Sequence, residues 1–183
     1  MEQLEWLPYA AERRKQLLRS LDRLEQEIAE LNQRVEAEVA QRPAAGKLQT
    51  HPGVGPVTAL AMVLTLGPAQ RFASGKQVGS YFGLIPSEHS SGGRQKLGRI
   101  SKQGSSFLRF LLVEAGQSAV RQDAELGRFY RRLAARKHRA LAKVAVARKL
   151  ATRLYLMLRE DWTYVQLCRA MVSASPSHSV VER

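Results

Sequence analysis

A long stretch without glycine or proline, from Tyr9 to Arg42, carries a narrow apolar seam. Apolar residues recur along it every three or four positions with charged residues between them, which is the pattern of a helix close to a coiled-coil heptad. Such a seam favours packing against another helix, either of a second copy or of the chain's own domain. We therefore predict a coiled-coil linker helix over residues 1–44. The seam consists of Leu17, Leu21, Leu24, Ile28, Leu31, Val35 and Val39.

The remainder of the chain predicts an all-α fold, in which the long N-terminal helix precedes a compact multi-helix domain over residues 45–165. The tail, residues 166–183, has little to bury, and we expect it to fray. Glycines, prolines and capping residues delimit the expected helices. These are a short helix of about residues 75–82 with Ser74 as its N-cap, a helix from about Ser105 to Arg121, one from the cap Asp123 to about Lys137, and a final helix of about residues 140–159.

Periodicity also predicts which side chains of these helices face the core. Inward positions are expected to include Tyr81, Phe107 and Phe129, together with Leu141, Val144, Leu150, Leu154 and Leu158. Trp162 and Tyr164 are interpreted as packing aromatics rather than as a platform for bases. The expected outward cations are Arg128, Arg131, Arg132 and Arg136, followed by Lys143, Arg148, Lys149 and Arg153.

The positive charge of the chain is concentrated in one third of its length. The formal net charge is +13, and residues 94–153 hold sixteen Lys and Arg against three Asp and Glu, while the flanking segments are balanced. Arginine-rich surfaces of this kind attract phosphate backbones. Nucleic acid is therefore the expected partner, and a membrane surface or an acidic protein is the alternative.

Residues 47–61 predict two helices joined by a tight Pro-Gly-Val-Gly turn, after a hinge at Arg42–Gly46. Gly53 and Gly55 permit the turn, and Pro56 suits the first turn of the second helix. This pattern is typical of a helix-hairpin-helix, in which N–H groups at the start of the second helix can bind a phosphate. A plain pair of antiparallel helices is the alternative.

Residues 88–104 combine hydroxyls, glycines and cations between two apolar runs. They lack helical or alternating periodicity, so we expect a loop with at most a short ribbon. Glycines let such a loop approach another backbone, and its cations can contact phosphate oxygens. The cations of this candidate site are Arg94, Lys96, Arg99, Lys102 and Arg109, and Arg148 and Lys149 are further candidates for nucleic-acid binding.

Other features of the composition exclude some classes of protein. Cys168 is the only cysteine, which excludes an internal disulfide and a cysteine-based metal site. No run of 18 apolar residues and no signal pattern occurs. We expect no membrane partner and a cytoplasmic, nucleoid-associated location in a bacterium.

Several separate motifs, in one order over about residues 47–155, resemble the C-terminal domain of the insertion-sequence one-hundred-and-ten transposases, the relatives of the Piv DNA invertase. Their number and order make a chance match improbable. The motifs are His51-Pro-Gly-Val-Gly-Pro-Val-Thr-Ala-Leu, Arg71-Phe-Ala-Ser-Gly-Lys-Gln, Tyr81-Phe-Gly-Leu-Ile-Pro, His89-Ser-Ser-Gly-Gly, Leu97-Gly-Arg-Ile-Ser-Lys-Gln-Gly, Leu108-Arg-Phe-Leu-Leu-Val-Glu-Ala and Ala145-Val-Ala-Arg-Lys-Leu.

The resemblance implies a recombinase that acts on DNA with a structured bridge RNA as guide. Family members carry a RuvC-like domain with four metal-binding acidic residues, then a coiled coil, then the domain that provides a serine nucleophile. The expected cofactor, Mg²⁺, would come with a RuvC-like domain, in cis or in trans, because this chain is similar only to the later parts. We expect no metal site in this chain, and we expect a homo-oligomer through the N-terminal helix.

The resemblance also implies which serine reacts. Ser91 directly precedes Gly92, as the family's serine commonly precedes its glycine, and Ser90 is the alternative. From composition alone, Ser-Ser-Gly-Gly would be interpreted as a flexible turn. A hydroxyl needs a base or a metal to take its proton, and the loop supplies cations but no clear base.

Three functions remain in competition at this point. The first is the C-terminal half of a DNA transposase, inactive as an isolated chain. The second is a non-catalytic helix-hairpin-helix module that binds nucleic acid. The third is a helical assembly protein whose oligomerisation does not depend on nucleic acid.

Overall fold

The computed structural model describes residues 8–88 and 97–173. Of the candidate site residues, Ser90, Ser91, Arg94 and Lys96 lie outside the described residues. The chain divides into two compact units, residues 1–38 and residues 39–183, which are described separately below.

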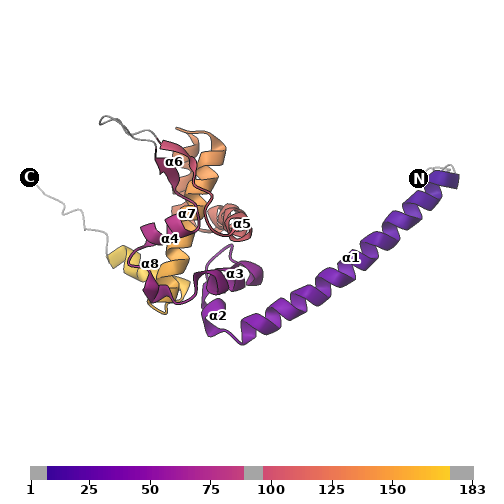
Figure 1. The fold of residues 1–183 in the computed structure, drawn as a ribbon, viewed down its shortest axis with the longest axis horizontal. Helices are drawn as coiled ribbons and strands as arrows, with labels where there is room; N and C mark the ends of the chain where they lie inside the picture. Colours follow the sequence, from indigo (N-terminus) through magenta and orange to yellow (C-terminus); the bar gives the residue numbers. More distant parts are fainter. Residues whose placement is uncertain (1–7, 89–96, 174–183) are drawn as a thin grey trace, which may run out of the picture. The chain divides into compact units, whose positions relative to one another are not determined.

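The described part of the first unit is one helix, α1, which spans Pro8–Ala40 (Figure 1). The predicted long helix is thus confirmed. Its apolar seam is open to solvent from Leu17 to Leu31, where each seam residue is about half exposed, whereas Val39 at its end is buried. Charged side chains lie between the seam residues, and Arg23 and Glu27 form an ion pair one turn apart at 3.5 Å.

The second unit is a helical domain with a single two-stranded ribbon among its described residues. The predicted all-α fold is therefore confirmed. The elements after α1 are α2 (Pro43–Gln49), α3 (Pro56–Leu66), the 3₁₀ turn η1 (Ala69–Arg71), α4 (Gly75–Tyr81), β1 (Pro86–Glu88), β2 (Leu97–Ile100), α5 (Ser106–Gln122), α6 (Ala124–Ala134), α7 (Arg139–Arg159) and α8 (Tyr164–Ser173).

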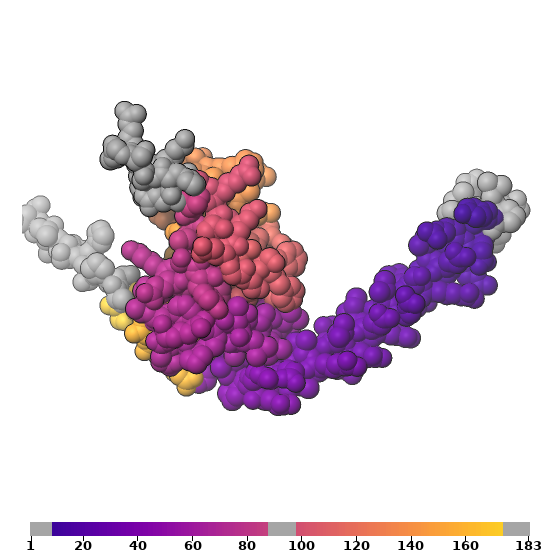
Figure 2. Space-filling view, viewed as in Figure 1, coloured from indigo at the N-terminus to yellow at the C-terminus, as the bar shows by residue number. Residues whose placement is uncertain are grey.

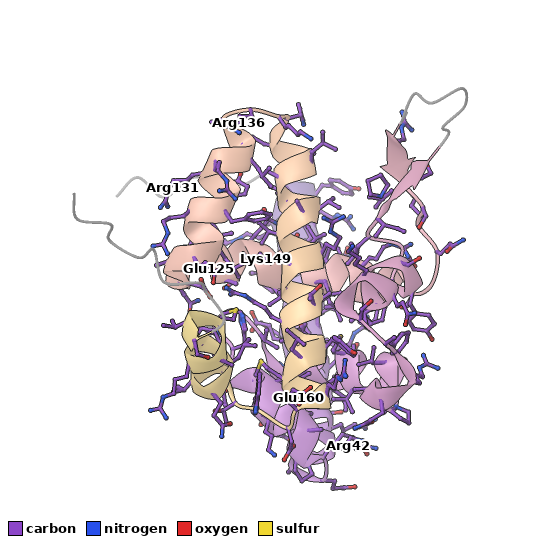
Figure 3. All side chains as sticks on the ribbon, turned by 90° about the vertical axis from the view of Figure 1, so that its left-hand side faces the viewer. Arg42, Glu125, Arg131, Arg136, Lys149 and Glu160 are labelled. Carbon is purple, nitrogen blue, oxygen red and sulfur yellow. The ribbon has the colours of Figure 1, made fainter. Side chains whose placement is uncertain are left out.

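The core of this domain is built around α7, which packs against α4, α5 and α6 (Figure 3). Leu150 and Leu154 are fully buried, and so is Tyr155, whose hydroxyl donates a hydrogen bond to the Phe72 carbonyl at 2.7 Å. The surface of residues 56–85, magenta in Figure 2, adjoins that of α5, which is rose. Helix α7 thus packs against α4, which precedes the ribbon in the chain, and against α5 and α6, which follow it.

Several helix boundaries follow from capping, as expected. Ser105 accepts a hydrogen bond from the Leu108 N–H at 3.1 Å at the start of α5, and Asp123 accepts one from the Leu126 N–H at 2.8 Å at the start of α6. Ser74 occupies the N-cap position of α4, but its hydroxyl makes no capping bond.

Other boundaries differ from the prediction. The expected hinge is shorter, because α2 begins at Pro43, whose fixed φ and missing N–H suit a first helical position. Helix α7 is not the last one, since α8 follows at Tyr164–Ser173 and includes part of the expected tail. Leu167 of α8 is buried, so this segment has an apolar anchor.

Some side chains expected in the core are exposed instead. Leu141 and Phe107 are each nearly 60% exposed, and Tyr81 at the end of α4 is 41% exposed. The buried stripe of α7 includes Ala142, Val146, Leu150 and Leu154, so the predicted stripe was one residue out of register at its start. Arg153, expected to point outward, is 2% exposed.

No helix in residues 8–88 and 97–173 combines the length and the apolar character needed to cross a membrane.

Candidate nucleic-acid interface

The ribbon of β1 and β2 flanks residues 89–96, the segment with the two candidate serines. The strands are antiparallel, with Pro86 opposite Ile100. The Ser87 hydroxyl donates to the Arg99 carbonyl at 3.0 Å, and below the strands the Ser101 N–H donates to the Ile85 carbonyl at 2.9 Å. The expectation of at most a short ribbon is confirmed for the described part of this segment.

Two glycines allow the base of the ribbon to pack closely against the end of α4. Gly83 and Gly104 both have positive φ, at +65° and +67°. A Cβ at Gly83 would collide with the Gln103 backbone, and a Cβ at Gly104 would collide with the Tyr81 carbonyl. The close backbone approach expected of the glycine-rich segment therefore occurs within the chain at Gly104.

Arg109 holds the same junction from the side of α5. Its Nη1 donates to the carbonyl oxygens of Phe82 at 3.3 Å, Gly104 at 3.2 Å and Gln103. This nitrogen is thus occupied by the end of α4 and by the loop that precedes α5. Arg99 and Lys102 are exposed near the ribbon, so they are the described cations of this region that face solvent.

The turn between α2 and α3 packs against α5. Gly53 has φ +82°, and a Cβ there would lie 2.5 Å from the Ala119 nitrogen and 2.7 Å from the Ala115 oxygen. Gly55, the N-cap of α3, has φ −89° and no atom within 4 Å of a Cβ placed on it. The close approach at Gly53 is therefore made to a helix of this chain, whereas the start of α3 beside Gly55 is open.

The exposed cations of the domain concentrate on α6, on the start of α7 and on the turn between them. In Figure 3 this part lies at the same end of the domain as the β1–β2 ribbon, with Glu160 towards the other end. Arg131 and Arg136 project outward there in Figure 3. The exposed members of the set are Arg128, Arg131, Arg132, Arg136, Lys137 and Arg139, and Arg148 is exposed further along α7.

A groove between α6 and α7 carries three of the cations around an aromatic ring. It is lined by Glu125, Arg128, Phe129, Arg132 and Lys149. The Lys149 ammonium lies 4.9 Å from the Phe129 ring centre and 2.5 Å from Glu125 Oε1. Lys149, a predicted nucleic-acid ligand, is thus already paired with a carboxylate, whereas Arg128 and Arg132 are exposed at the groove.

An ionic cluster adjoins this groove at the start of α6, with Arg153 and Asp123 buried and the Glu125 side chain 43% exposed at the groove. Arg153 Nη1 lies 2.6 Å from Asp123 Oδ2, and Tyr164 donates to the same oxygen at 2.7 Å. Arg153 Nη2 lies 2.5 Å from Glu125 Oε2. We call Asp123, Glu125, Arg153 and Tyr164 the buried cluster.

The electrostatics of the buried cluster follow from these contacts. Burial alone would raise the pKa of Asp123, but hydrogen bonds from the Leu126 N–H, Tyr164 and Arg153 outweigh it and hold the pKa below its usual value. Burial likewise opposes ionisation of Glu125, yet Lys149 and Arg153 lower its pKa. Burial, helped by the Asp123 carboxylate, raises the pKa of Tyr164. The two carboxylates are therefore ionised and neutralised by cations of the chain.

His51 borders the same cluster and is uncharged. Its Nδ1 lies 2.9 Å from the Pro52 carbonyl, which can only accept, so Nδ1 carries the proton. Its ring packs edge-on against Tyr164 at 4.7 Å, and Nε2 is buried without a hydrogen-bond partner among the residues that the structure describes. Burial lowers the pKa of His51 to about 4.

The acidic residues of this region do not fit a magnesium site. Carboxylate oxygens bind Mg²⁺ where they are available to it, but those of Asp123 and Glu125 already face Arg153, Lys149 and Tyr164. Within the described segments, no group of three or more His, Cys, Asp or Glu residues could hold a metal ion.

The structure brings together only some of the predicted site residues. Arg99, Lys102 and Arg109 lie around the base of the ribbon, whereas Gly53 lies against α5 and Lys149 in the groove between α6 and α7. The buried cluster was missed by sequence reasoning because its members come from positions far apart in the chain. The capping position of Asp123 was the one signal of it in the sequence.

Comparison with known proteins identifies relatives over most of the chain. A probable family 20 transposase of Pseudomonas aeruginosa is 34% identical over 155 residues, which are 82% of this chain and 46% of the relative. A transposase for insertion sequence element IS1328 of Yersinia enterocolitica is 32% identical over 146 residues, 74% of this chain and 44% of the relative. A transposase for insertion sequence element IS1111A of Coxiella burnetii is 32% identical over 122 residues, 64% of this chain and 34% of the relative.

The chain therefore spans less than half the length of each of these three relatives. Residues 45–131 match the model of the family described as transposase IS116/IS110/IS902. This segment runs from α2 through the ribbon and α5 to most of α6. The chain thus carries, over residues 45–131, a domain of the IS116/IS110/IS902 transposase family.

Proposed function

We propose that this chain is part of a DNA transposase, in which the helical domain binds DNA and presents Ser91 or Ser90 as the nucleophile of strand exchange. The observation that carries the proposal is the position of the ribbon that flanks these serines. It lies at the same end of the domain as the exposed cations of α6 and α7 (Figure 3). A phosphate backbone held by these cations would pass close to the ribbon.

The serine would carry out one nucleophilic substitution at phosphorus. A bond forms between Oγ and phosphorus while a bond from phosphorus to a deoxyribose oxygen breaks, and the released sugar hydroxyl takes up a proton. The phosphoserine link keeps the bond energy for resealing. Arg99 and Lys102, both exposed near the ribbon, can stabilise negative charge on the phosphate oxygens. As cations they cannot accept the serine's proton.

The proton acceptor must therefore come from elsewhere. The described carboxylates of the buried cluster are occupied by Arg153 and Lys149, so they do not fit this role. We infer that an acidic, metal-binding RuvC-like domain, in cis or in trans, completes the site. A structured guide RNA is a further expected partner, and the excess of cations on α6 and α7 would accommodate its phosphates as well as those of DNA.

Trapping of a covalent adduct tests the catalytic part of the proposal. The full chain is mixed with a RuvC-like domain of a relative, Mg²⁺ and a nicked DNA substrate that prevents resealing. We expect a phosphoserine–DNA adduct whose digestion maps it to residues 90–91 by mass spectrometry. Ser91→Ala removes it and Ser90→Ala retains it if Ser91 is the nucleophile, and the reverse assigns Ser90.

A non-catalytic nucleic-acid-binding module is the second candidate. The open start of α3 beside Gly55 favours it, because a phosphate can approach the N–H groups there without any reaction. This candidate predicts salt-dependent binding of DNA and no adduct under the same conditions. Binding without an adduct, in a mixture in which the RuvC-like domain is folded and loaded with metal, would establish it in place of the transposase.

A further inference from the structure

A second concave site lies where α5, α6 and α7 meet, away from the ribbon and from the groove described above. It is a pocket of about 120 Å³ lined by Gly116, Gln117, Val120, Tyr130, Lys143 and Val146. Since one water occupies about 30 Å³ of liquid, the pocket is larger than a hydration site. Most of its exposed lining is apolar. It therefore suits a small, flat, mainly apolar group with polar edges.

Gly116 keeps the pocket open. A Cβ at this position would lie 3.2 Å from Val146 Cγ1, so a side chain there would press on the residue that forms the pocket floor. Val146 is buried and belongs to the same core cluster as Ala119 and Leu126, against which Val120 and Tyr130 pack. The floor and walls are thus part of the packed core, and the pocket is preformed.

Three polar side chains surround this apolar floor. Gln117 donates through Nε2 to Glu114 Oε1 at 3.0 Å, which leaves its amide oxygen available. Among the described residues, the Tyr130 hydroxyl and the Lys143 ammonium have no hydrogen-bond or ion-pair partner. Both side chains are half-buried and their polar atoms remain open to water, so they are free to bond a ligand that supplies donors and acceptors along its edge.

Two further cations lie close to the pocket on the helices that form it. Arg121 lies one turn beyond Gln117 on α5, and Arg139 lies one turn before Lys143 on α7. Residues four positions apart share a helix face, and both arginines are exposed. A strand that placed one group in the pocket would therefore meet positive charge on both sides, as a phosphate backbone requires.

We propose that this pocket receives a single unpaired base of DNA. A base is planar, has an apolar face for Val120 and Val146, and carries donors and acceptors on its edge for Gln117 and Tyr130. Its flanking phosphates would contact Lys143, Arg121 and Arg139. The inference rests on the proposed function in one respect, namely that the domain binds DNA, and it adds a place where an unpaired base is bound.

The test compares two DNA duplexes that differ by one extrahelical base in the middle of one strand. Binding of each to the full chain is measured by fluorescence anisotropy at fixed salt, and 2-aminopurine at the extrahelical position reports its environment. We expect the bulged duplex to bind roughly tenfold more tightly, since stacking and edge contacts of one base contribute on this scale. The fluorescence of 2-aminopurine should change on binding.

The double variant Gln117→Leu/Tyr130→Phe keeps the volume and the apolar surface of the pocket but removes its edge contacts. It should bring the affinity ratio of bulged to paired DNA close to one and leave the affinity for paired DNA unchanged. Gln122→Leu is the matched control, because Gln122 lies on α5 outside the pocket and also bonds one turn back, to Ser118 Oγ at 3.3 Å. It should keep the wild-type ratio, and thermal unfolding confirms that each variant is folded.

The outcomes separate this inference from the proposed function. Equal binding of both duplexes, or a preference that the double variant retains, overturns the pocket assignment and leaves DNA binding intact. A preference seen only with an RNA duplex that carries the same bulge overturns the assignment to DNA. Absence of binding to every DNA overturns the proposed function, and the pocket assignment with it.

Discussion

The guanidinium of Arg153 is buried against the carboxylate of Asp123, with Nη1 2.6 Å from Oδ2 and each side chain 3% exposed. Arg153 belongs to the middle of α7, and Asp123 is the N-cap of α6. Tyr164 of α8 donates to the same carboxylate oxygen. The Asp123 carboxylate therefore joins three helices, because Arg153 of α7 lies 30 positions after it in the chain and Tyr164 of α8 lies 41 positions after it.

Truncation of Arg153 should destabilise the domain strongly. Arg153→Met leaves the buried Asp123 carboxylate without its cation and removes one of the two cations that face Glu125. Removing one partner of a buried ion pair costs about 3–5 kcal/mol. We expect a loss of this size in the free energy of unfolding, measured by urea denaturation at pH 7.5. Arg136→Met, at an exposed arginine after α6, is the control and should change stability by less than about 0.5 kcal/mol. Equal stabilities of the two variants would contradict the structural role of the pair.

Stability should fall as the pH decreases from 6.5 towards 4, mainly because of His51. Its pKa is lowered from 6.5 to about 4 in the folded chain by burial. Between these values the unfolded chain binds the proton and the folded chain does not, so acid lowers the free energy of unfolding. The loss between pH 7.5 and pH 5 should be about 2 kcal/mol, at about 1.4 kcal/mol per pH unit below 6.5. The lowered pKa values of Asp123 and Glu125 act in the same direction only at still lower pH.

Urea denaturation at several pH values measures this slope, and His51→Phe is the informative variant. Phenylalanine keeps the ring packed against Tyr164 and cannot be protonated. It should flatten the dependence between pH 6.5 and 5, whatever its effect on stability at pH 7.5. An unchanged slope in His51→Phe would assign the pH dependence to other groups.

The sequence predicted the helices well because their signals are local. The periodicity of α1, the start of α5 near Ser105 and the cap Asp123 each act within one or two turns, and the structure confirms the long helix, the helix start and the cap. The register of the first turn of α7 was wrong because Leu141 and Ala142 satisfy similar apolar patterns, and only packing decides which is buried. Helix α8 was missed because its sequence signal is weak and its anchor, Leu167, depends on tertiary contacts.

The sequence predicted less of the candidate site than of the helices. The charge excess of residues 94–153 predicted a basic surface, but not that Arg153 and Lys149 would neutralise carboxylates inside the domain. Charge counts cannot distinguish a solvated cation from a paired one. The pocket at Gly116 also left no pattern in the sequence, because three helices contribute between one and three residues each.

Gly53 and Gly55 should respond very differently to alanine. At Gly53 the new Cβ would lie 2.5 Å from the Ala119 nitrogen, at a φ of +82° that disfavours side chains. Gly53→Ala should lower the free energy of unfolding by about 2–4 kcal/mol through overpacking and backbone strain. Gly55→Ala meets no atom within 4 Å and should be nearly neutral for stability. Thermal and urea unfolding of the two variants measure the difference, and similar losses would contradict the packing of this turn on α5.

The arginines of the α6–α7 groove should set the salt dependence of DNA binding. Each phosphate contact contributes about 0.9 to the slope of log affinity against log salt, so Arg128→Gln/Arg132→Gln should reduce that slope by about two. Lys76→Gln, at an exposed lysine of α4 outside the basic third, is the control and should leave the slope unchanged. Anisotropy titrations between 50 and 200 mM salt give the slopes. A double variant with the wild-type slope would place the DNA elsewhere on the domain.

The exposed seam of α1 should mediate self-association of the chain. Leu24 is 48% exposed and Leu31 is 58% exposed in the single chain, and a second copy would bury such residues along a coiled coil. Leu24→Glu places charge in this seam, so we expect the oligomer of the wild-type chain to dissociate into monomers. Gln26→Glu introduces the same charge outside the seam and should leave the oligomer intact. Sedimentation velocity without nucleic acid measures the mass of each, and a monomeric wild-type chain would refute association through α1.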